Sequence, residues 1–253
     1  MRPSAWTPAS FAGRTVLVTG AASGLGAAIA ESFLRTGAAV VCTDVDPKVH
    51  HLARDIDSSG QRTLSLVFDV SDESAFTHGF AEAVARFGRV DVLVNNAAIT
   101  ATGSPWDINL EEWDRVMAVN LRGTFIGCRI AGEHMRTQRG GRIINLSSFA
   151  GQHPSRATGL HYAASKAGIL AVTRGFALEL APAGVTVNAI APSAIEGPQL
   201  ASLSADRRDA LLRTIPLGRA GHTDEVTAAV RWLASDGASY VTGQTLDING
   251  GRG

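Results

Sequence analysis

The chain has 253 residues, of which 23 are basic and 23 acidic, so its formal net charge is zero. This balance, without any basic block, argues against nucleic acid or an anionic membrane as the main partner. The length fits one large α/β domain with an ample core. We treat residues 1–253 as a single domain because no linker, repeat or low-complexity tract divides them.

The sequence carries no signal for export or membrane insertion. The first dozen residues contain Pro3 and Pro8 and lack the apolar core of a signal peptide, and no apolar run approaches a membrane span. Cys42 and Cys128 lie far apart, which is typical of small buried thiols in a reducing compartment. We therefore expect a cytoplasmic protein. We also expect no metal, because the cysteines and histidines have no ligand spacing.

Strand-like and helix-like segments alternate along the chain. Short apolar runs typical of buried strands fall at about 14–19, 38–43, 63–68, 90–95, 141–147, 184–191 and 244–248. Helical patterns lie between them, near 24–36, 47–59, 72–87, 110–138, 161–181 and 223–235. Repeated βα units predict a doubly wound parallel sheet of about seven strands with helices on both faces. A ligand crevice is expected at the carboxyl ends of the strands, where the strand order reverses.

The first strand-like run leads into a glycine-rich turn, in the stretch T-V-L-V-T-G-A-A-S-G-L-G at 15–26. Strand, turn and helix in this order place free backbone N–H groups and the positive end of a helix dipole at one point, which suits a pyrophosphate. Gly20, Gly24 and Gly26 leave the backbone accessible because a Cβ would block the turn. Their G-x-x-x-G-x-G spacing differs from the G-x-G-x-x-G fingerprint, so a purely structural turn is the alternative.

Asp44 ends the second strand-like run, near the spacing of about 20 residues at which an acid meets an adenosine ribose. A carboxylate there can accept hydrogen bonds from the 2′- and 3′-hydroxyls and would repel a 2′-phosphate. The sequence therefore predicts NAD rather than NADP as the cofactor. The alternative is an ordinary acidic residue in a turn with Asp46 and Pro47.

Polar residues also follow the later strands. Asp69 follows the third, where it either meets an adenine amine or caps the next helix, for which Ser71 is a candidate N-cap. The fourth ends in Asn95-Asn96-Ala97-Ala98, which indicates backbone packed close to a flat group or, alternatively, an Asx turn. The fifth ends in Ser147-Ser148 and the sixth in Ala191-Pro192-Ser193.

Tyr162 and Lys166 lie four residues apart where a helix begins, so their side chains share one helix face. An ammonium beside a phenol favours the phenolate, so we expect a lowered tyrosine pKa and proton exchange with an alcohol or ketone. Ser148 can donate a hydrogen bond to a carbonyl oxygen as charge develops there. Taken alone, a Y-x-x-x-K pair is also typical of a solvated helix face.

With these motifs in this order, the sequence resembles the short-chain dehydrogenases/reductases of the single-domain type. The resemblance runs from about Phe11 to Gly251 and includes N-N-A, I-I-N-L-S-S, Y-A-A-S-K-A-G and V-T-V-N-A-I-A-P. It implies a Rossmann-type fold and reversible hydride transfer between NAD(H) and a secondary alcohol or ketone. A non-catalytic, NAD-sensing protein on the same fold is the alternative function.

The resemblance also implies the role of each site residue. Tyr162 would be the acid/base, Lys166 would bind the nicotinamide ribose, Ser148 would orient the substrate, and Asn120 would hold a water that links Lys166 to solvent. The cofactor-binding residues that it implies are Gly20, Ala22, Ser23, Gly24, Leu25, Gly26, Asp44, Asp69, Val70, Asn96, Ala97, Tyr162, Lys166, Pro192 and Ile195.

Three positions depart from the usual family pattern. Ala98 and Ser193 stand where glycine is common, and Gly197 stands where a threonine often contacts the cofactor. The segment between Ser148 and Tyr162 is about one residue longer than is common, so we expect a bulge within 152–161.

The sequence leaves the substrate open among 3-oxoacyl groups, sugars, steroids and simple ketones. Residues 193–214 are expected to form a lid over it. The family implies a homotetramer through the helices at 110–138 and 161–181, which are rich in small residues; packing within one chain is the alternative. The expected substrate contacts are Ile99, Phe149, His153, His161, Ala194 and Leu200, with a plain wall role favoured for both histidines.

Overall fold

The structure is a computed structural model that describes residues 10–153, 158–201 and 203–253. Within these ranges, seven parallel strands form one sheet in the order β3-β2-β1-β4-β5-β6-β7. The strands are β1 (Thr15–Thr19), β2 (Ala39–Asp44), β3 (Thr63–Val67), β4 (Val92–Asn95), β5 (Gly141–Leu146), β6 (Val185–Pro192) and β7 (Thr245–Ile248). All the predicted strands are confirmed, because buried parallel strands are continuous apolar runs with polar or glycine ends.

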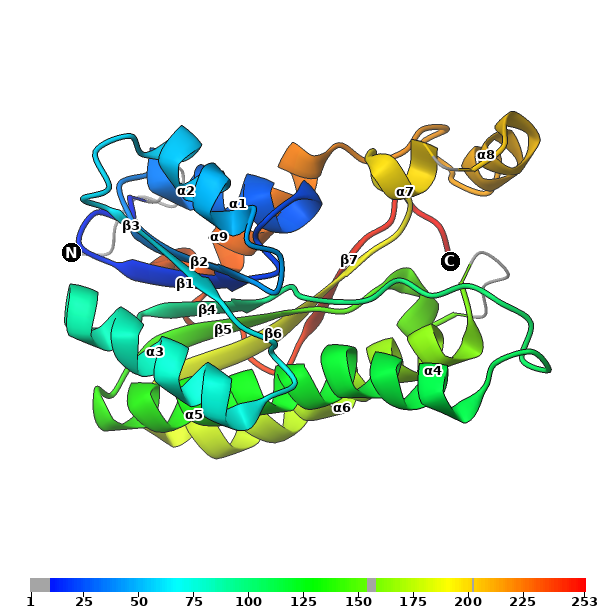
Figure 1. Ribbon diagram of the computed structural model, residues 1–253. Helices are drawn as coiled ribbons and strands as arrows, with labels where there is room; N and C mark the ends of the chain where they lie inside the picture. The colour runs from blue at the N-terminus through cyan, green and yellow to red at the C-terminus, as the bar shows by residue number, and fades with distance from the viewer. Residues whose placement is uncertain (1–9, 154–157, 202) are drawn as a thin grey trace.

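Helices cover both faces of the sheet, as the doubly wound prediction requires. Figure 1 shows α1, α2 and α9 on one face and α3, α5 and α6 on the other. The α-helices are α1 (Gly24–Arg35), α2 (Val49–Ile56), α3 (Glu73–Phe87), α4 (Leu110–Val116), α5 (Gly123–Thr137), α6 (Leu160–Leu180), α7 (Pro198–Ala201), α8 (Ala205–Leu212) and α9 (Thr223–Ala234). Shorter turns are η1 (Met117–Arg122), η2 (Phe149–Gly151), η3 (Ala181–Ala183) and η4 (Asp236–Ala238). In the described part of the chain, no helix has both the length and the apolar character needed to cross a lipid bilayer.

Each face of the sheet has its own hydrophobic core. On the α1 side, Phe33 of α1 is fully buried and packs edge-on against Phe11, with 4.9 Å between ring centroids. On the opposite side, Phe76 of α3 and Met135 of α5 are fully buried with Leu93 of β4. Burial on both faces fixes the position of the sheet between the two helix layers.

The strand order reverses beside β1, which pairs with β2 on one side and β4 on the other. The loops after β1 and β4 therefore meet at the carboxyl end of the sheet. There the Asn96 amide nitrogen donates to the carbonyl oxygens of Thr19 at 2.9 Å and Gly20 at 3.1 Å. Asn96 thus fixes the shape of the glycine turn from the neighbouring strand.

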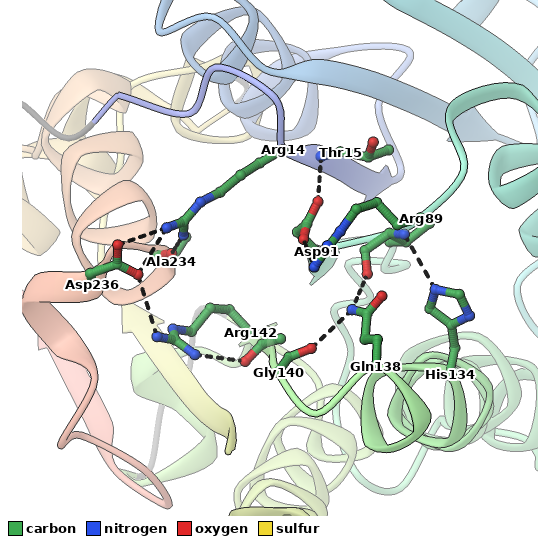
Figure 2. Close-up of polar contacts among 12 residues, drawn as sticks. Arg14, Thr15, Arg89, Asp91, His134, Gln138, Gly140, Arg142, Ala234 and Asp236 are labelled. Atoms are coloured by element: carbon green, nitrogen blue, oxygen red, sulfur yellow. Dashed lines mark hydrogen bonds and ion pairs between the residues drawn. The ribbon is translucent and has the colours of Figure 1, made fainter. Parts of the chain in front are cut away.

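The opposite, amino end of the sheet is closed by ion pairs (Figure 2). Asp91, just before β4, accepts from the Thr15 backbone N–H at 2.8 Å and pairs with Arg89 at 2.6 Å. Asp236 accepts two 2.8 Å hydrogen bonds from the Arg14 guanidinium. These contacts join the starts of β1 and β4 and the end of α9, away from the carboxyl ends of the strands.

The helix predicted over 110–138 is confirmed over 110–137, but it is not α-helical throughout. It consists of α4, the π-helical turn η1 and α5. Inside η1, the Asn120 side chain accepts from the Ile99 N–H at 2.7 Å and donates to the Ile99 carbonyl at 3.0 Å. This double contact with the loop after β4 accompanies the widened turn, a local feature that frequently marks functional sites.

Residues 193–214, predicted as a lid, contain α7 and α8. Figure 1 shows both helices projecting from the end of the sheet at which β6 ends. No residue of α8 is buried, so this helix has little packing against the body of the protein. The segment is therefore placed where it can cover a ligand at the carboxyl end of the sheet.

Candidate active site

A pocket of about 1110 Å³ lies at the carboxyl ends of the strands. It gathers Ser148, Tyr162 and Lys166 with all but one of the predicted cofactor residues. The cofactor residues that line it are Gly20, Ser23, Gly24, Leu25, Gly26, Asp44, Asp69, Val70, Asn96, Ala97, Tyr162, Lys166, Pro192 and Ile195. Ala22 and Asn120 are predicted site residues that do not line it.

Two glycines of the turn pack so closely against neighbouring backbone that a Cβ would not fit. Gly20 has φ +67°, and a Cβ on it would lie 2.7 Å from the Cα of Ala97. A Cβ on Gly26 would overlap the Gly20 carbonyl oxygen. Among the described residues, none accepts a hydrogen bond from the N–H groups of Gly24, Leu25 and Gly26. These free donors at the start of α1 fit a bound phosphate group.

Asp44 lies where β2 ends, and two backbone groups hold its carboxylate. Its oxygens accept from the N–H of Ala22 at 2.8 Å and of Asp46 at 3.0 Å. A carboxylate fixed in this way presents its remaining lone pairs to the pocket.

Asp69 also lines the pocket, but it does not cap the following helix. Its carboxylate accepts from the N–H and the hydroxyl of Ser71, both at 2.8 Å. The N-cap of α3 is Asp72, which accepts from the Ala75 N–H at 3.1 Å. The prediction of Ser71 as the cap is therefore wrong by one residue. Capping is also excluded as the role of Asp69.

The Ser148–Tyr162–Lys166 group is preformed and largely buried. Tyr162 is 8% exposed and hydrogen-bonds to Ser148. Lys166 is 3% exposed, and its ammonium lies 5.6 Å from the centroid of the Tyr162 ring. Gly151, on the turn that Ser148 opens, packs directly on α6, where a Cβ would lie 2.7 Å from the Lys166 backbone. The serine turn and the tyrosine helix are thus held at a fixed separation, which excludes the solvated-face alternative.

The direction of the tyrosine shift differs from the prediction. Burial raises the pKa of Tyr162, and the hydrogen bond with Ser148 lowers it in part. Burial also lowers the pKa of Lys166 to about 8. The Lys166 ammonium donates to the Leu146 carbonyl at 2.7 Å instead of to the phenol. Loss of water around the phenol therefore outweighs the Ser148 hydrogen bond, so the neutral, proton-donating form of Tyr162 is favoured.

Four of the six predicted substrate contacts line the apolar end of the pocket. Ile99, Phe149, Ala194 and Leu200 line it, together with Leu203 and Leu211 of the lid segment. His153 does not line it but stacks on Phe149, with ring centroids 4.5 Å apart. His161 is fully buried and contacts Glu112 at 3.1 Å. The bulge predicted within 152–161 falls partly on 154–157, outside the described residues.

Comparison with known proteins decides the family. A family model described as "Enoyl-(Acyl carrier protein) reductase" matches residues 20–252. The 3-oxoacyl-[acyl-carrier-protein] reductase FabG of Thermotoga maritima is 39% identical over 240 residues, 94% of this chain and 97% of the relative. The chain belongs to the short-chain dehydrogenase/reductase family. The names of two other relatives of this short-chain dehydrogenase/reductase give different alcohols as substrates. They are a cis-4-hydroxycyclohexanecarboxylate dehydrogenase of Sinomonas cyclohexanicum (39% identical; 96% and 97% covered) and a 3beta-hydroxysteroid dehydrogenase 1 of Eggerthella lenta (43%; 94% and 93%).

In this short-chain dehydrogenase/reductase, Asn120 contacts the site through the residues next to it and not through the pocket. The residue is fully buried, and its amide also donates to the Ser165 hydroxyl at 3.1 Å, which in turn donates to the Tyr162 carbonyl at 2.7 Å. Because Ile99 takes the other side-chain contacts, the amide connects the loop after β4 to α6. The geometry gives it a positioning contact with the tyrosine helix.

Among the pocket residues of this short-chain dehydrogenase/reductase that sequence reasoning missed, two are cationic. Arg252 and Arg115 both line the pocket. Arg252 follows an Asn-Gly-Gly turn signal at 249–251, but such a signal does not tell which way the next side chain points. In the described residues, no group of three or more His, Cys, Asp or Glu side chains is arranged to hold a metal ion.

Proposed function

We propose that the protein is an NAD-dependent oxidoreductase that interconverts a secondary alcohol and a ketone. The observation that carries the proposal is one pocket with a phosphate-sized glycine turn and Asp44 at one end and the buried Ser148–Tyr162–Lys166 group at the other. The same pocket is lined by apolar side chains of the lid segment, which suits a carbon skeleton.

The proton chemistry follows from the three side chains. Ser148 donates a hydrogen bond to the carbonyl oxygen, and Tyr162 gives its proton to that oxygen as negative charge develops. Lys166 places a positive charge beside the phenolate that remains, and water returns the proton. Alcohol oxidation is the reverse. Because burial raises the pKa of Tyr162, the acid form needed for ketone reduction dominates at neutral pH.

The cofactor residues fit a nicotinamide dinucleotide, because the close packing of Gly20 and Gly26 holds the turn in shape and the free N–H groups at the start of α1 can bind a phosphate. When bound, this cofactor supplies or accepts the hydride. Asp44 would accept from the adenosine ribose hydroxyls, and a 2′-phosphate would meet its fixed negative charge. We therefore propose NAD, with NADP disfavoured.

Asp44→Asn should lower the preference for NADH over NADPH in kcat/KM by about 10- to 100-fold, because it removes a carboxylate close to a 2′-phosphate. Asparagine keeps an oxygen for the Ala22 N–H, so the turn should be preserved. The measurement is kcat/KM with each cofactor at a fixed ketone concentration. As a control, Asp46→Asn changes a nearby exposed carboxylate and should leave the ratio unchanged. An equal ratio in Asp44→Asn and the wild type would remove Asp44 from the ribose site.

The direct test of the reaction is a screen of ketones and secondary alcohols with NADH and NAD⁺, followed by the nicotinamide absorbance at about 340 nm. The relatives supply the panel, which contains 3-oxoacyl thioesters, 4-oxocyclohexanecarboxylate and 3-oxosteroids, with simple ketones and sugars added. NADH binding without turnover of any of them would favour the NAD-sensing alternative.

We also propose a homotetramer in the cytoplasm. Much of the small-residue content of α5 and α6 serves packing within one chain, since a Cβ on Gly132 or Gly168 would meet Leu180 or Leu121. The outer face of these helices nevertheless exposes Leu178 (76%), which a second copy can cover. For the cytoplasm, the support is that Cys42 and Cys128 are unpaired and buried, as in proteins of a reducing compartment.

The wild type should therefore have four times the 26.4 kDa chain mass in light scattering coupled to size exclusion. Leu178→Lys should dissociate it to smaller species because the lysine charge would be buried in the interface. Val67→Lys, on the exposed edge strand β3, is the matched control and should stay tetrameric. A monomeric wild type would contradict the tetramer, and a tetrameric Leu178→Lys would move the interface away from this face.

A further inference from the structure

A turn after β7, held by side-chain hydrogen bonds, directs Arg252 into the pocket. Gly250 and Gly251 both have positive φ, at +64° and +85°, and the Gly251 N–H donates to the Asn249 side chain at 2.9 Å. The Asn249 amide donates to the Arg252 carbonyl at 2.7 Å. The Gly250 carbonyl accepts from the Leu217 N–H at 3.1 Å, which attaches the turn to the segment after α8. The backbone that carries Arg252 is therefore fixed on both sides.

The Arg252 side chain lies beside the catalytic group. Its guanidinium carbon is 4.3 Å from the centroid of the Phe149 ring, and Phe149 directly follows Ser148. Its Nη1 donates to the Ser193 hydroxyl at 3.2 Å. Ser193 is the residue that replaces the usual glycine after Pro192, so the departure noted in the sequence has a structural partner. The serine hydroxyl accepts from the arginine and keeps its own proton for another acceptor.

The charge of Arg252 is not compensated by the protein. Among the residues that the structure describes, no carboxylate forms an ion pair with it. A guanidinium has five N–H donors, and the Ser193 contact uses one of them. Of the other pocket cations, Lys166 is directed to the Leu146 carbonyl, and Arg115 is exposed on α4. A half-buried arginine with free donors, stacked on an aromatic ring, matches the planar geometry of a carboxylate.

We propose that Arg252, with Ser193, binds a carboxylate of the substrate and so selects oxo acids and hydroxy acids over neutral ketones and alcohols. The inference rests on the proposed function and names the substrate class of the same site. The guanidinium stacks on the ring of Phe149, the residue after Ser148, so one substrate would place its carboxylate at Arg252 and its reacting carbonyl at Ser148. The Ser193 hydroxyl adds a third donor to the two that a guanidinium offers a carboxylate.

The test compares each oxo acid with its own methyl ester, because the two share a carbon skeleton and differ in charge. The pairs are 4-oxocyclohexanecarboxylate, 4-oxopentanoate and 5-oxohexanoate with their esters. They are assayed with NADH in the wild type, Arg252→Gln, Arg252→Lys and Ser193→Ala. Arg35→Gln, an exposed arginine of α1 outside the pocket, is the control. Titration calorimetry of the same compounds onto the NADH-loaded protein measures binding without turnover.

The wild type should prefer at least one acid over its ester. Arg252→Gln should lower kcat/KM and affinity for that acid by about 10- to 100-fold and leave the ester within about twofold, as expected for one lost charge-assisted contact. Arg252→Lys should recover part of the loss, because lysine keeps the positive charge but lacks the paired N–H donors of the guanidinium. Ser193→Ala should give a smaller loss in the same direction, and Arg35→Gln should behave as the wild type.

Three results would overturn the proposal. The first is an acid-to-ester ratio that Arg252→Gln does not change. The second is an equal loss for acid and ester with a raised KM for NADH, which would assign Arg252 to the cofactor. The third is a loss of the acid preference in Arg115→Gln instead. If the wild type reduces no ketone but still binds the acids through Arg252, the reaction proposal fails and the carboxylate site remains. If no acid binds, the carboxylate site is excluded.

Discussion

Replacing Tyr162 by phenylalanine should lower kcat by about 10²–10⁴-fold while NADH binding is retained. The substitution removes one oxygen from a ring that is 8% exposed, so the packing of α6 against the serine turn should not change. What is lost is the proton donor to the carbonyl oxygen and its hydrogen bond with Ser148. Steady-state kinetics in the reductive direction and fluorescence titration with NADH measure the two effects separately.

Tyr240→Phe is the matched control for this variant. Tyr240 is the other tyrosine of the chain and is fully exposed, so the same atom is removed without effect on the pocket. Turnover of Tyr162→Phe close to that of Tyr240→Phe would reject Tyr162 as the acid. Loss of NADH binding together with activity would instead mean that the hydroxyl holds the cofactor site together.

Lys166→Met should lower kcat by about 10²-fold, because the ammonium lies 5.6 Å from the centroid of the Tyr162 ring, and a charge at about that distance from a developing phenolate contributes about 3 kcal/mol at an effective dielectric of about 20. The same change should relieve a destabilising buried charge in the cofactor-free protein. Burial lowers the pKa of Lys166 from 10.5 to about 8, so the folded state resists the charge that the unfolded chain accepts freely.

The sign of this stability effect follows from proton binding. Between pH 8 and 10.5 the unfolded chain holds more protons on Lys166 than the folded protein does, so wild-type stability rises with pH across that window. Below pH 8 the buried charge costs about 3 kcal/mol, and above pH 10.5 this cost is absent. The Tm of Lys166→Met relative to the wild type should therefore be higher at pH 7 than at pH 10.5, by about 5–10 °C.

Comparing the two pH values separates the charge from the packing, because the lost hydrogen bond to the Leu146 carbonyl is the same at both. Lys48→Met is the control, since Lys48 is the only other lysine of the chain and its side chain is 78% exposed. A relative Tm of Lys166→Met that does not depend on pH would show that Lys166 is not charged and buried in the folded protein.

The sheet and the catalytic tyrosine helix could be predicted because their signals are local. A parallel strand buried on both faces is a continuous apolar run, so all the strand ends agree with the prediction to within two residues. Tyr162 and Lys166 share a helix face because they are four residues apart on α6. The glycine turn was also recognisable, since strand, glycines and helix are contiguous at 15–26.

Two of the features that the sequence did not show depend on contacts between distant segments, and the third depends on a local contact. The π-helical turn η1 within the predicted 110–138 helix involves Asn120 and the backbone of Ile99, 21 positions away. The Lys166 ammonium on α6 donates to the Leu146 carbonyl at the end of β5, and no local sequence pattern indicates that partner. The cap of α3 moved from Ser71 to Asp72 because Asp69 takes the Ser71 donors.

By itself, the sequence determined the doubly wound α/β fold, because periodicity and spacing act over a few residues, and for the same reason it pointed to a ligand turn and to a tyrosine–lysine pair that could exchange a proton. The tertiary structure decided the pKa directions of Tyr162 and Lys166 and the entry of Arg252 into the pocket. Both depend on burial and on which distant side chains meet. Burial changes the solvation of a charge, and that change is set only when the chain closes around it.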